Sequence, residues 1–357
     1  MKSFKSTVIA GLAVLIFAAS VLQAVPASAQ SSASLSIVPK KNYIIEPGKS
    51  AKDTLTVRNL DTERTLELTL RVVDFTYTDD GGTPKLMLAE DAPQTTWSLK
   101  PFISVPTSVS IAPKATKTLD MTVAFPASQG AGSYYSAILY SSGSPDGGNV
   151  GLSASGVSLV FASVPGEVSE DLKLEKLGSY NPAAKDSKAG YTYFNMAKPQ
   201  MIAYTLKNNG NVTEAPVGSI TLKDMFGGEQ TIGNINPNKS LALVGQTRTF
   251  TSCIKLKSED VNFNGQTTQA KACGDPDLWP GLYTVSLDVF YGQNGNNTQE
   301  ITGNATFWYL PAWFLILLFI LIVFITVVVW RVVRAIRRKL YGPKAPRRMK
   351  VSRRRRK

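Results

Sequence analysis

Residues 307–330 read FWYLPAWFLILLFILIVFITVVVW, a stretch of 24 residues without a charged side chain. An α-helix rises about 1.5 Å per residue, so this stretch covers about 36 Å and exceeds the hydrocarbon core of a bilayer, about 30 Å. Trp308 and Trp313 lie near one end and Trp330 at the other, and aromatic rings favour the headgroup level. We therefore predict a membrane-spanning helix over Phe307–Trp330, with Pro311 in its first turn, rather than a buried core helix.

The segment after the predicted helix, residues 331–357, carries 14 Lys and Arg residues and no Asp or Glu. Cytoplasmic flanks of membrane helices carry the positive excess, so the chain from Arg331 is expected inside and its N-terminus outside, as in a single-pass protein of the cell membrane. The basic run could also bind anionic membrane lipid. We expect no nucleic-acid binding, because Tyr341 is the one aromatic residue among these charges.

The first 29 residues have the features of a signal peptide. Two lysines in the first five residues precede an apolar stretch over Val8–Val25, and the small residues Ala27-Ser28-Ala29 follow. This order predicts secretion and cleavage between Ala29 and Gln30. An uncleaved N-terminal anchor is the alternative.

Between these segments the sequence pattern is that of an all-β protein. Over residues 30–306, Val, Ile, Thr, Tyr and Phe alternate with polar residues, and Gly, Pro, Asn, Asp and Ser interrupt the runs. Such punctuation is typical of antiparallel β-sandwiches, and the length suits two domains. We predict an all-β ectodomain of two tandem immunoglobulin-like β-sandwiches, at 30–165 and 166–306, followed by one C-terminal transmembrane α-helix.

One strand in the first predicted domain changes its pattern. Apolar residues alternate from Leu66 to Val72 and continue in the opposite phase from Val73 to Tyr77. A one-residue slip turns every side chain over, so we predict a β-bulge or a change of sheet here. Asp79-Asp80-Gly81-Gly82 is predicted to form a hairpin turn, and its two carboxylates are too few for a calcium site.

The two predicted domains share local sequence features. An alternating strand ends at Asn59 in the first and at Asn208 in the second, and a turn follows each. Tyr134 and Tyr283 each open a strand directly after a Gly-containing loop, as a tyrosine corner does in immunoglobulin-like folds. These features indicate two copies of one architecture in tandem.

The cysteine and histidine content limits the chemistry. Cys253 and Cys273 are the two cysteines, and outside the membrane they are expected to form a disulfide, with free thiols as the alternative. That bridge closes a loop of about 20 residues, worth about 3 kcal/mol in the chain-entropy model. The chain has no histidine, which excludes Ser–His–Asp and Cys–His catalysis and the usual zinc sites. We expect that the protein is not an enzyme and binds no cofactor or metal. Catalysis by two carboxylates distant in sequence, as in glycosidases, stays open as an alternative.

Several local sequences resemble the bacterial WxL-interacting protein family, as does the order of signal peptide, two β-sandwiches, membrane helix and basic tail. They are Ser36-Ile37-Val38-Pro39 followed by Tyr43 and Pro47-Gly48, the turn after Tyr77, the segment Pro106–Pro113, and the loop from Pro126 through Gly130 and Gly132 to Tyr134-Tyr135. Lys40-Lys41-Asn42 stands where the family has an Asn-Gln pair. The resemblance implies that the first domain binds peptidoglycan and the second a surface protein or host ligand.

The residues themselves predict a membrane-anchored cell-envelope protein that displays two binding domains to cell-wall glycan or to another surface protein. Aromatic rings stack on sugar faces, so Trp97, Tyr134 and Trp279 are the candidate ligand contacts, with core or corner packing as the alternative for each. The other candidate function is a structural or accessory stalk subunit of an envelope complex, because the strand expected over Gln299–Phe307 runs directly into the membrane helix. A sensor is disfavoured, since 27 cytoplasmic residues are too few for a signalling domain.

Overall fold

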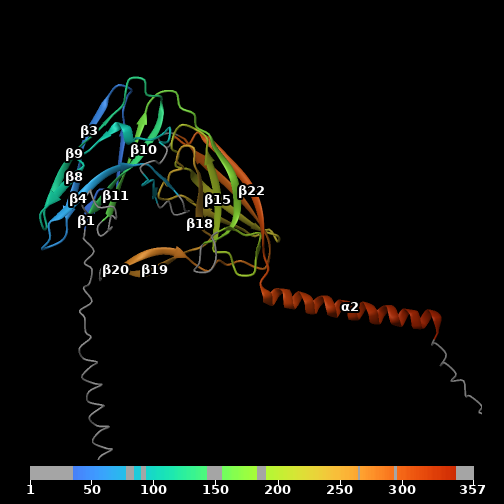
Figure 1. Cartoon of the computed structure of the whole chain (residues 1–357). Helices are drawn as coiled ribbons and strands as arrows, with labels where there is room; N and C mark the ends of the chain where they lie inside the picture. Colours follow the sequence, from blue (N-terminus) through green and yellow to red (C-terminus); the bar gives the residue numbers. More distant parts are fainter. Residues whose placement is uncertain are drawn as a thin grey trace, which may run out of the picture.

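The computed structural model describes residues 35–77, 84–89, 94–142, 155–182, 190–263, 266–292 and 296–342. As predicted, these residues are mostly in β-strands, and one long apolar helix follows at the C-terminal end (Figure 1). The predicted signal peptide with its cleavage between Ala29 and Gln30, the turn Asp79–Gly82 and the tail beyond Gly342 lie outside the described residues.

Two sheets in the N-terminal half pack around one apolar core. The four-stranded sheet has the order β1 (Leu35–Ile37), β3 (Ser50–Asn59), β9 (Thr116–Ala124) and β7 (Ile103–Ser104). The five-stranded sheet has the order β2 (Lys40–Ile44), β11 (Ser155–Val164), β10 (Gly132–Ser142), β4 (Leu66–Val73) and β8 (Ser108–Ile111). The alternating residues of β3 and β10 meet in this core, because every second side chain of a strand points to the same face. We call this unit the first sandwich.

The C-terminal half repeats the arrangement, and we call it the second sandwich. Its four-stranded sheet has the order β13 (Gly190–Tyr191), β12 (Leu172–Asn181), β15 (Met201–Asn208) and β18 (Thr247–Cys253). Its five-stranded sheet has the order β14 (Phe194–Asn195), β22 (Gln299–Tyr309), β21 (Gly281–Tyr291), β16 (Val217–Asp224) and β17 (Glu229–Gly233). In both five-stranded sheets the first strand runs parallel to its neighbour, β2 to β11 and β14 to β22.

The paired features found in the sequence occupy equivalent places. The Tyr134 hydroxyl donates to the Gly130 carbonyl and the Tyr283 hydroxyl to the Trp279 carbonyl, both at 2.9 Å. The two predicted tyrosine corners are therefore confirmed.

Asn59 and Asn208 are fully buried at the ends of β3 and β15. Each side-chain amide donates to backbone carbonyls of two other segments, and each side-chain oxygen accepts from the backbone N–H two residues later, at 2.9 Å. One asparagine thus satisfies several buried backbone groups of its sandwich, which explains its presence in both copies.

The pattern change near Val73 marks a change of sheet and no bulge. The sequence predicted a β-bulge or a change of sheet at this place. Pairing of β4 with β10 runs without a register shift from Leu68 to Val73, which rules out the bulge and leaves the change of sheet. After Asp74 the chain enters β5 (Phe75–Tyr77), which pairs with β6 (Pro84–Leu86) in a separate two-stranded sheet. The apolar positions change phase because the second sandwich covers the other face of the sheet there.

The helix α2 (Ala312–Tyr341) begins five residues later than predicted, and β22 extends to Tyr309, beyond the expected domain end at residue 306. Phe307 is fully buried and stacks on Tyr283 with ring centroids 5.3 Å apart, so tertiary packing holds this apolar residue in the strand. Pro311 is the N-cap in an extended conformation, not a first-turn residue. The helical segment Ala312–Leu340 is long and apolar enough to cross a membrane.

The buried asparagine of the second sandwich gives a stability test. Asn208→Ala leaves the Val212 and Ala242 carbonyls without their side-chain donor, so we expect a loss of about 3 kcal/mol in the free energy of unfolding. The matched control is the exposed neighbour, Asn209→Ala, with an expected change within about 0.5 kcal/mol. Chemical denaturation measures both, and equal effects would contradict the role given to Asn208.

Candidate functional site

Trp97 lies between the two sandwiches. Its ring stacks on Tyr135 with centroids 6.5 Å apart and an interplanar angle of 27°. It also lies so close to Gly245 that a Cβ there would be 2.6 Å from a Trp97 ring carbon. Trp97 is therefore a packing residue of the domain contact, with Tyr135 stacked on its ring.

An apolar cluster, which we call the joint, holds the two sandwiches together. The outer face of β10 is buried in it, and Leu243 and Val244 come from the second sandwich. The buried members are Val73, Phe75, Tyr135, Ala137, Leu139, Phe161, Leu243 and Val244. Because β10 is buried on both faces, the two domains form one packed unit and are not separate domains joined by a flexible linker.

Polar contacts fix the alignment of the joint. Gln246 Nε2 donates to the Tyr135 hydroxyl at 3.1 Å, and Gln246 Oε1 accepts from the Tyr77 backbone N–H at 3.3 Å. The Arg248 guanidinium lies over the Tyr77 ring, 4.5 Å from its centroid. Burial raises the pKa of Tyr135, so its hydroxyl stays neutral and able to donate to the Val244 carbonyl.

A second group of hydrogen bonds lies beside the joint. The Ser133 backbone N–H donates to the Asn211 carbonyl at 2.8 Å, and Asn211 Nδ2 donates to the Ala131 carbonyl at 3.1 Å. The Thr213 backbone N–H donates to Ser133 Oγ at 3.0 Å. The turn after β15 therefore bonds to the loop before β10, which adds directional contacts to an apolar interface.

Of the other two candidate aromatics, one is buried and one is exposed. Tyr134 is 9% exposed and serves the first tyrosine corner, whereas Trp279 is 72% exposed. In the described part of the first sandwich no Phe, Tyr or Trp side chain is exposed. The structure thus leaves Trp279 as the one predicted ligand-contact residue that is open to a partner.

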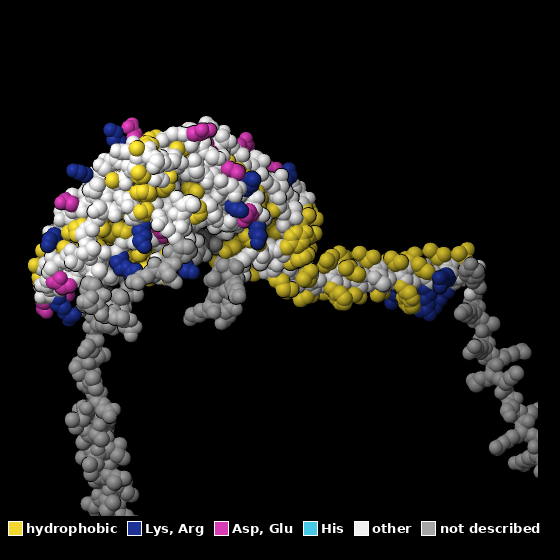
Figure 2. Space-filling view, turned by 45° about the horizontal axis from the view of Figure 1, so that its top comes forward, with side chains coloured by type: hydrophobic (Ala, Val, Ile, Leu, Met, Phe, Trp, Pro, Cys, Tyr) yellow, Lys and Arg dark blue, Asp and Glu magenta, His cyan; other side chains and the backbone are white. Residues whose placement is uncertain are grey.

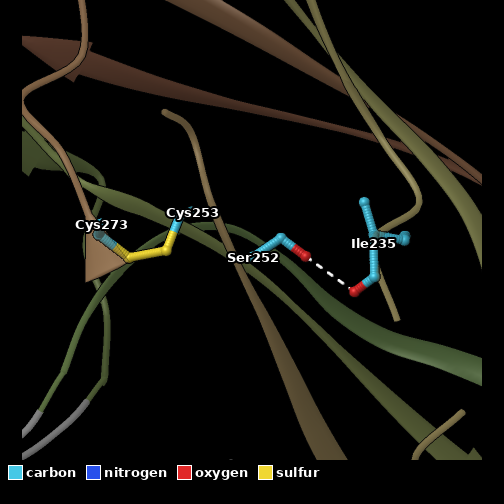
Figure 3. The surroundings of a disulfide bond; sticks show 4 residues. All are labelled: Ile235, Ser252, Cys253 and Cys273. Atoms are coloured by element: carbon cyan, nitrogen blue, oxygen red, sulfur yellow. Dashed lines mark hydrogen bonds between the residues drawn. A yellow bond between two sulfur atoms is a disulfide. The ribbon is translucent and has the colours of Figure 1, made fainter. Parts of the chain in front are cut away.

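A disulfide-bonded ribbon, β19 (Leu256–Phe263) with β20 (Gln266–Cys273), projects from the second sandwich (Figure 1). Cys253 ends β18, Cys273 ends β20, and the two are bonded, which confirms the predicted disulfide (Figure 3). Next to it, Ser252 Oγ donates to the Ile235 carbonyl at 3.0 Å and keeps this end of β18 on the sandwich. Sequence reasoning predicted the bridge but not the ribbon that it anchors.

A buried carboxyl lies at the opposite end of the second sandwich. Glu214 is 1% exposed and contributes to a cavity of about 330 Å³ that Lys239 and Asn297 also line. Burial raises the pKa of Glu214 to about 7, and the negative charge of Glu170 acts in the same direction. No group of three acidic, Cys or His side chains in the described residues could hold a metal ion.

Comparison with known proteins assigns no family. No family model and no curated protein matches the chain. Similar solved structures include a chaperone–tip adhesin complex of CFA/I fimbriae (12% identity, 78% of this chain, 100% of that chain, TM-score 0.36), the class 5 fimbriae chaperone CfaA (14%, 76%, 98%, 0.32) and the E. coli chaperone DraB (13%, 67%, 96%, 0.31). Scores at this level define neither the fold nor the activity.

The close approach of Trp97 to Gly245 predicts that alanine destabilises the protein more at Gly245 than at a second glycine, Gly227. Gly245 and Gly227 both have positive φ, 71° and 95°, but a Cβ at Gly227 meets nothing within 4 Å. Both substitutions strain the backbone, and Gly245→Ala also displaces Trp97, for an additional cost of about 1–3 kcal/mol. Thermal unfolding of the two variants measures the difference, and similar losses would contradict the tight joint.

The raised pKa of Glu214 predicts that the stability of the fold depends on pH. Its pKa in the folded state lies above the value in the unfolded chain, so the folded state holds the extra proton and the free energy of unfolding falls as pH rises from about 5 to about 7. Glu214→Gln removes that contribution, and Glu300→Gln, at an exposed site, keeps the wild-type profile. Denaturation at several pH values tests this, and an unchanged slope in Glu214→Gln would contradict it.

Proposed function

We propose that this chain is a membrane-anchored protein of a bacterial cell envelope whose ectodomain binds another surface protein through the ribbon β19–β20. In this function α2 is the anchor, the basic residues from Arg331 lie in the cytoplasm, and the two sandwiches form a rigid arm outside the membrane. The chain is then an accessory subunit of an envelope complex. The observation that carries the proposal is the exposed, covalently anchored ribbon.

Both sandwiches are assigned to the immunoglobulin-like class. Each has a four-stranded and a five-stranded sheet, and the chain changes sheets near the start of each, from β1 to β2 and from β13 to β14. The tyrosine corner in each copy supports the same assignment.

The ribbon has the properties of a β-augmentation site. Within the described residues β19 and β20 pair with each other and with no further strand, so each has an outer edge of backbone groups. An isolated two-stranded ribbon is marginally stable in water, and such edges are templates for an added strand. Leu256 and Val261 are 60% and 44% exposed and offer apolar contacts beside that edge.

The position of the ribbon's base supports a partner near the membrane. Lys255 Nζ lies 2.7 Å from Asp277 Oδ2, and the Ile254 carbonyl accepts from Gln230 Nε2 at 3.1 Å. Asp277 leads into β21, whose first residue, Gly281, pairs with Tyr309, the last residue of β22 and three positions before the start of α2. The ribbon and the helix therefore leave the same end of the second sandwich, which favours a membrane-protein partner over the cell wall.

Binding of peptidoglycan, which the resemblance to the WxL-interacting family implies, has less structural support. Trp97 and Tyr134 are occupied by the joint and by the tyrosine corner, and they were the candidate sugar contacts of the first sandwich. Glycan is therefore one arm of the test and not the proposed ligand.

The test compares full-length chains in lipid nanodiscs that carry Leu256→Ser with Val261→Ser or, as a control, Ile44→Ser with Leu60→Ser, two exposed apolar residues of the first sandwich. Each is incubated with detergent-solubilised envelope proteins and with purified peptidoglycan. We expect wild type and control to retain one membrane protein and the ribbon variant to bind it at least about tenfold more weakly. Equal retention by both variants, or saturable binding to peptidoglycan alone, would overturn the proposal.

A further inference from the structure

Exposed apolar side chains gather where α2 leaves the second sandwich. Figure 2 shows this apolar surface continuing from the helix onto the domain. Phe226 is 78% exposed and Trp279 is 72% exposed, and exposed apolar side chains that adjoin one another mark a contact surface. We call the set the apolar collar: Tyr193, Phe194, Met196, Met225, Phe226 and Trp279.

Strand pairing brings these residues together around the exit of the helix. Phe194 pairs with Trp308 on one side of β22, and Gly281 pairs with Tyr309 on the other side. Met225 reaches over Gly281, where a Cβ would lie 2.9 Å from the Met225 sulfur. The Trp279 backbone is bound to the Tyr283 hydroxyl through both its N–H and its carbonyl. The collar therefore comes from three separate chain segments at one end of one sheet.

The connection to the helix is too short to lift the collar away from a membrane. Leu310 and Pro311 are the residues between β22 and α2, and two residues span at most about 7 Å. The Leu310 backbone N–H also donates to the Asn195 carbonyl at 2.8 Å, which fixes the connection to β14. Neighbouring strands lie about 4.8 Å apart, so the sheet positions that carry the collar are within about 15 Å of the start of the helix.

We propose that the apolar collar lies in the headgroup layer of the membrane that α2 crosses, on the outer leaflet, and contacts phospholipid there. This rests on α2 crossing the bilayer, as proposed above, and not on the protein partner of the ribbon. The occupant follows from continuity: Trp313, in the first helical turn, is itself an interfacial residue, and the collar adjoins it. Aromatic rings and methionine suit the boundary between acyl chains and headgroups.

The charged side chains near the collar fit the same placement. Lys198 pairs with Asp275 at 3.0 Å and Lys255 with Asp277 at 2.7 Å. These pairs are partly exposed, so they form a polar rim that can stay in water or meet lipid headgroups while the collar is buried. Seating the collar gives the rigid arm a second attachment and fixes its tilt to the membrane.

The experiment measures tryptophan fluorescence of the full chain in nanodiscs. The spectrum of wild type minus that of Trp279→Phe reports Trp279 alone, and Trp330→Phe and Trp97→Phe isolate Trp330 in the helix and Trp97 in the joint. One quencher is a phospholipid with a nitroxide on its headgroup, and the other is aqueous iodide. Trp330 reports insertion of α2, so a failure of membrane anchoring is seen separately from a failure of the collar.

We expect the nitroxide lipid to quench Trp279 severalfold more than Trp97, with little quenching by iodide. In Phe194→Ser with Phe226→Ser, the emission of Trp279 shifts to longer wavelength and iodide quenches it. Trp330 quenched by lipid together with Trp279 quenched by iodide would overturn the proposal. So would Trp279 shielded from both quenchers in a chain that self-associates, since a second copy would then cover the collar.

Discussion

The structure depends on the joint, where the outer face of β10 is buried between the sandwiches. A sheet that normally presents one face to water here has apolar residues on both, and Tyr135 and Ala137 are as fully buried as the core residues Ile138 and Tyr140. Exposing that face to water costs the free energy of the apolar surface it buries. The two sandwiches therefore stay packed and act as one body.

This rigidity bears on the proposed membrane anchor. At the opposite end from the joint, Phe307 is buried in the second core, and α2 begins three residues after β22 ends. If α2 crosses a bilayer, as proposed, it sets the direction of the second sandwich and, through the joint, that of the first. A partner bound to the ribbon would meet an arm of defined direction, as an accessory subunit requires.

Much of the fold could be predicted because its signals are local. Alternation over β3 and β9, the glycine before each corner tyrosine and the uncharged run after Pro311 depend on neighbouring residues alone. What the sequence left open or misplaced depends on contacts distant in sequence. Val73 and Phe75 look out of phase with Leu70 because a different domain covers them, so the pattern fitted a bulge as well as a change of sheet. Phe307 was predicted to be helical because burial in a core and burial in lipid select the same residue type.

The sequence by itself determined the class of the molecule: repeated short strands, one apolar helix, one disulfide, and no histidine for catalysis. Only the tertiary structure decided which aromatic residues are free. By sequence, Trp97 and Trp279 have the same status as candidate ligand contacts. In the structure Trp97 packs against Gly245, and Trp279 is exposed just before the start of β21. Side-chain exposure depends on residues more than a hundred positions away, and a pattern of neighbours does not carry that information.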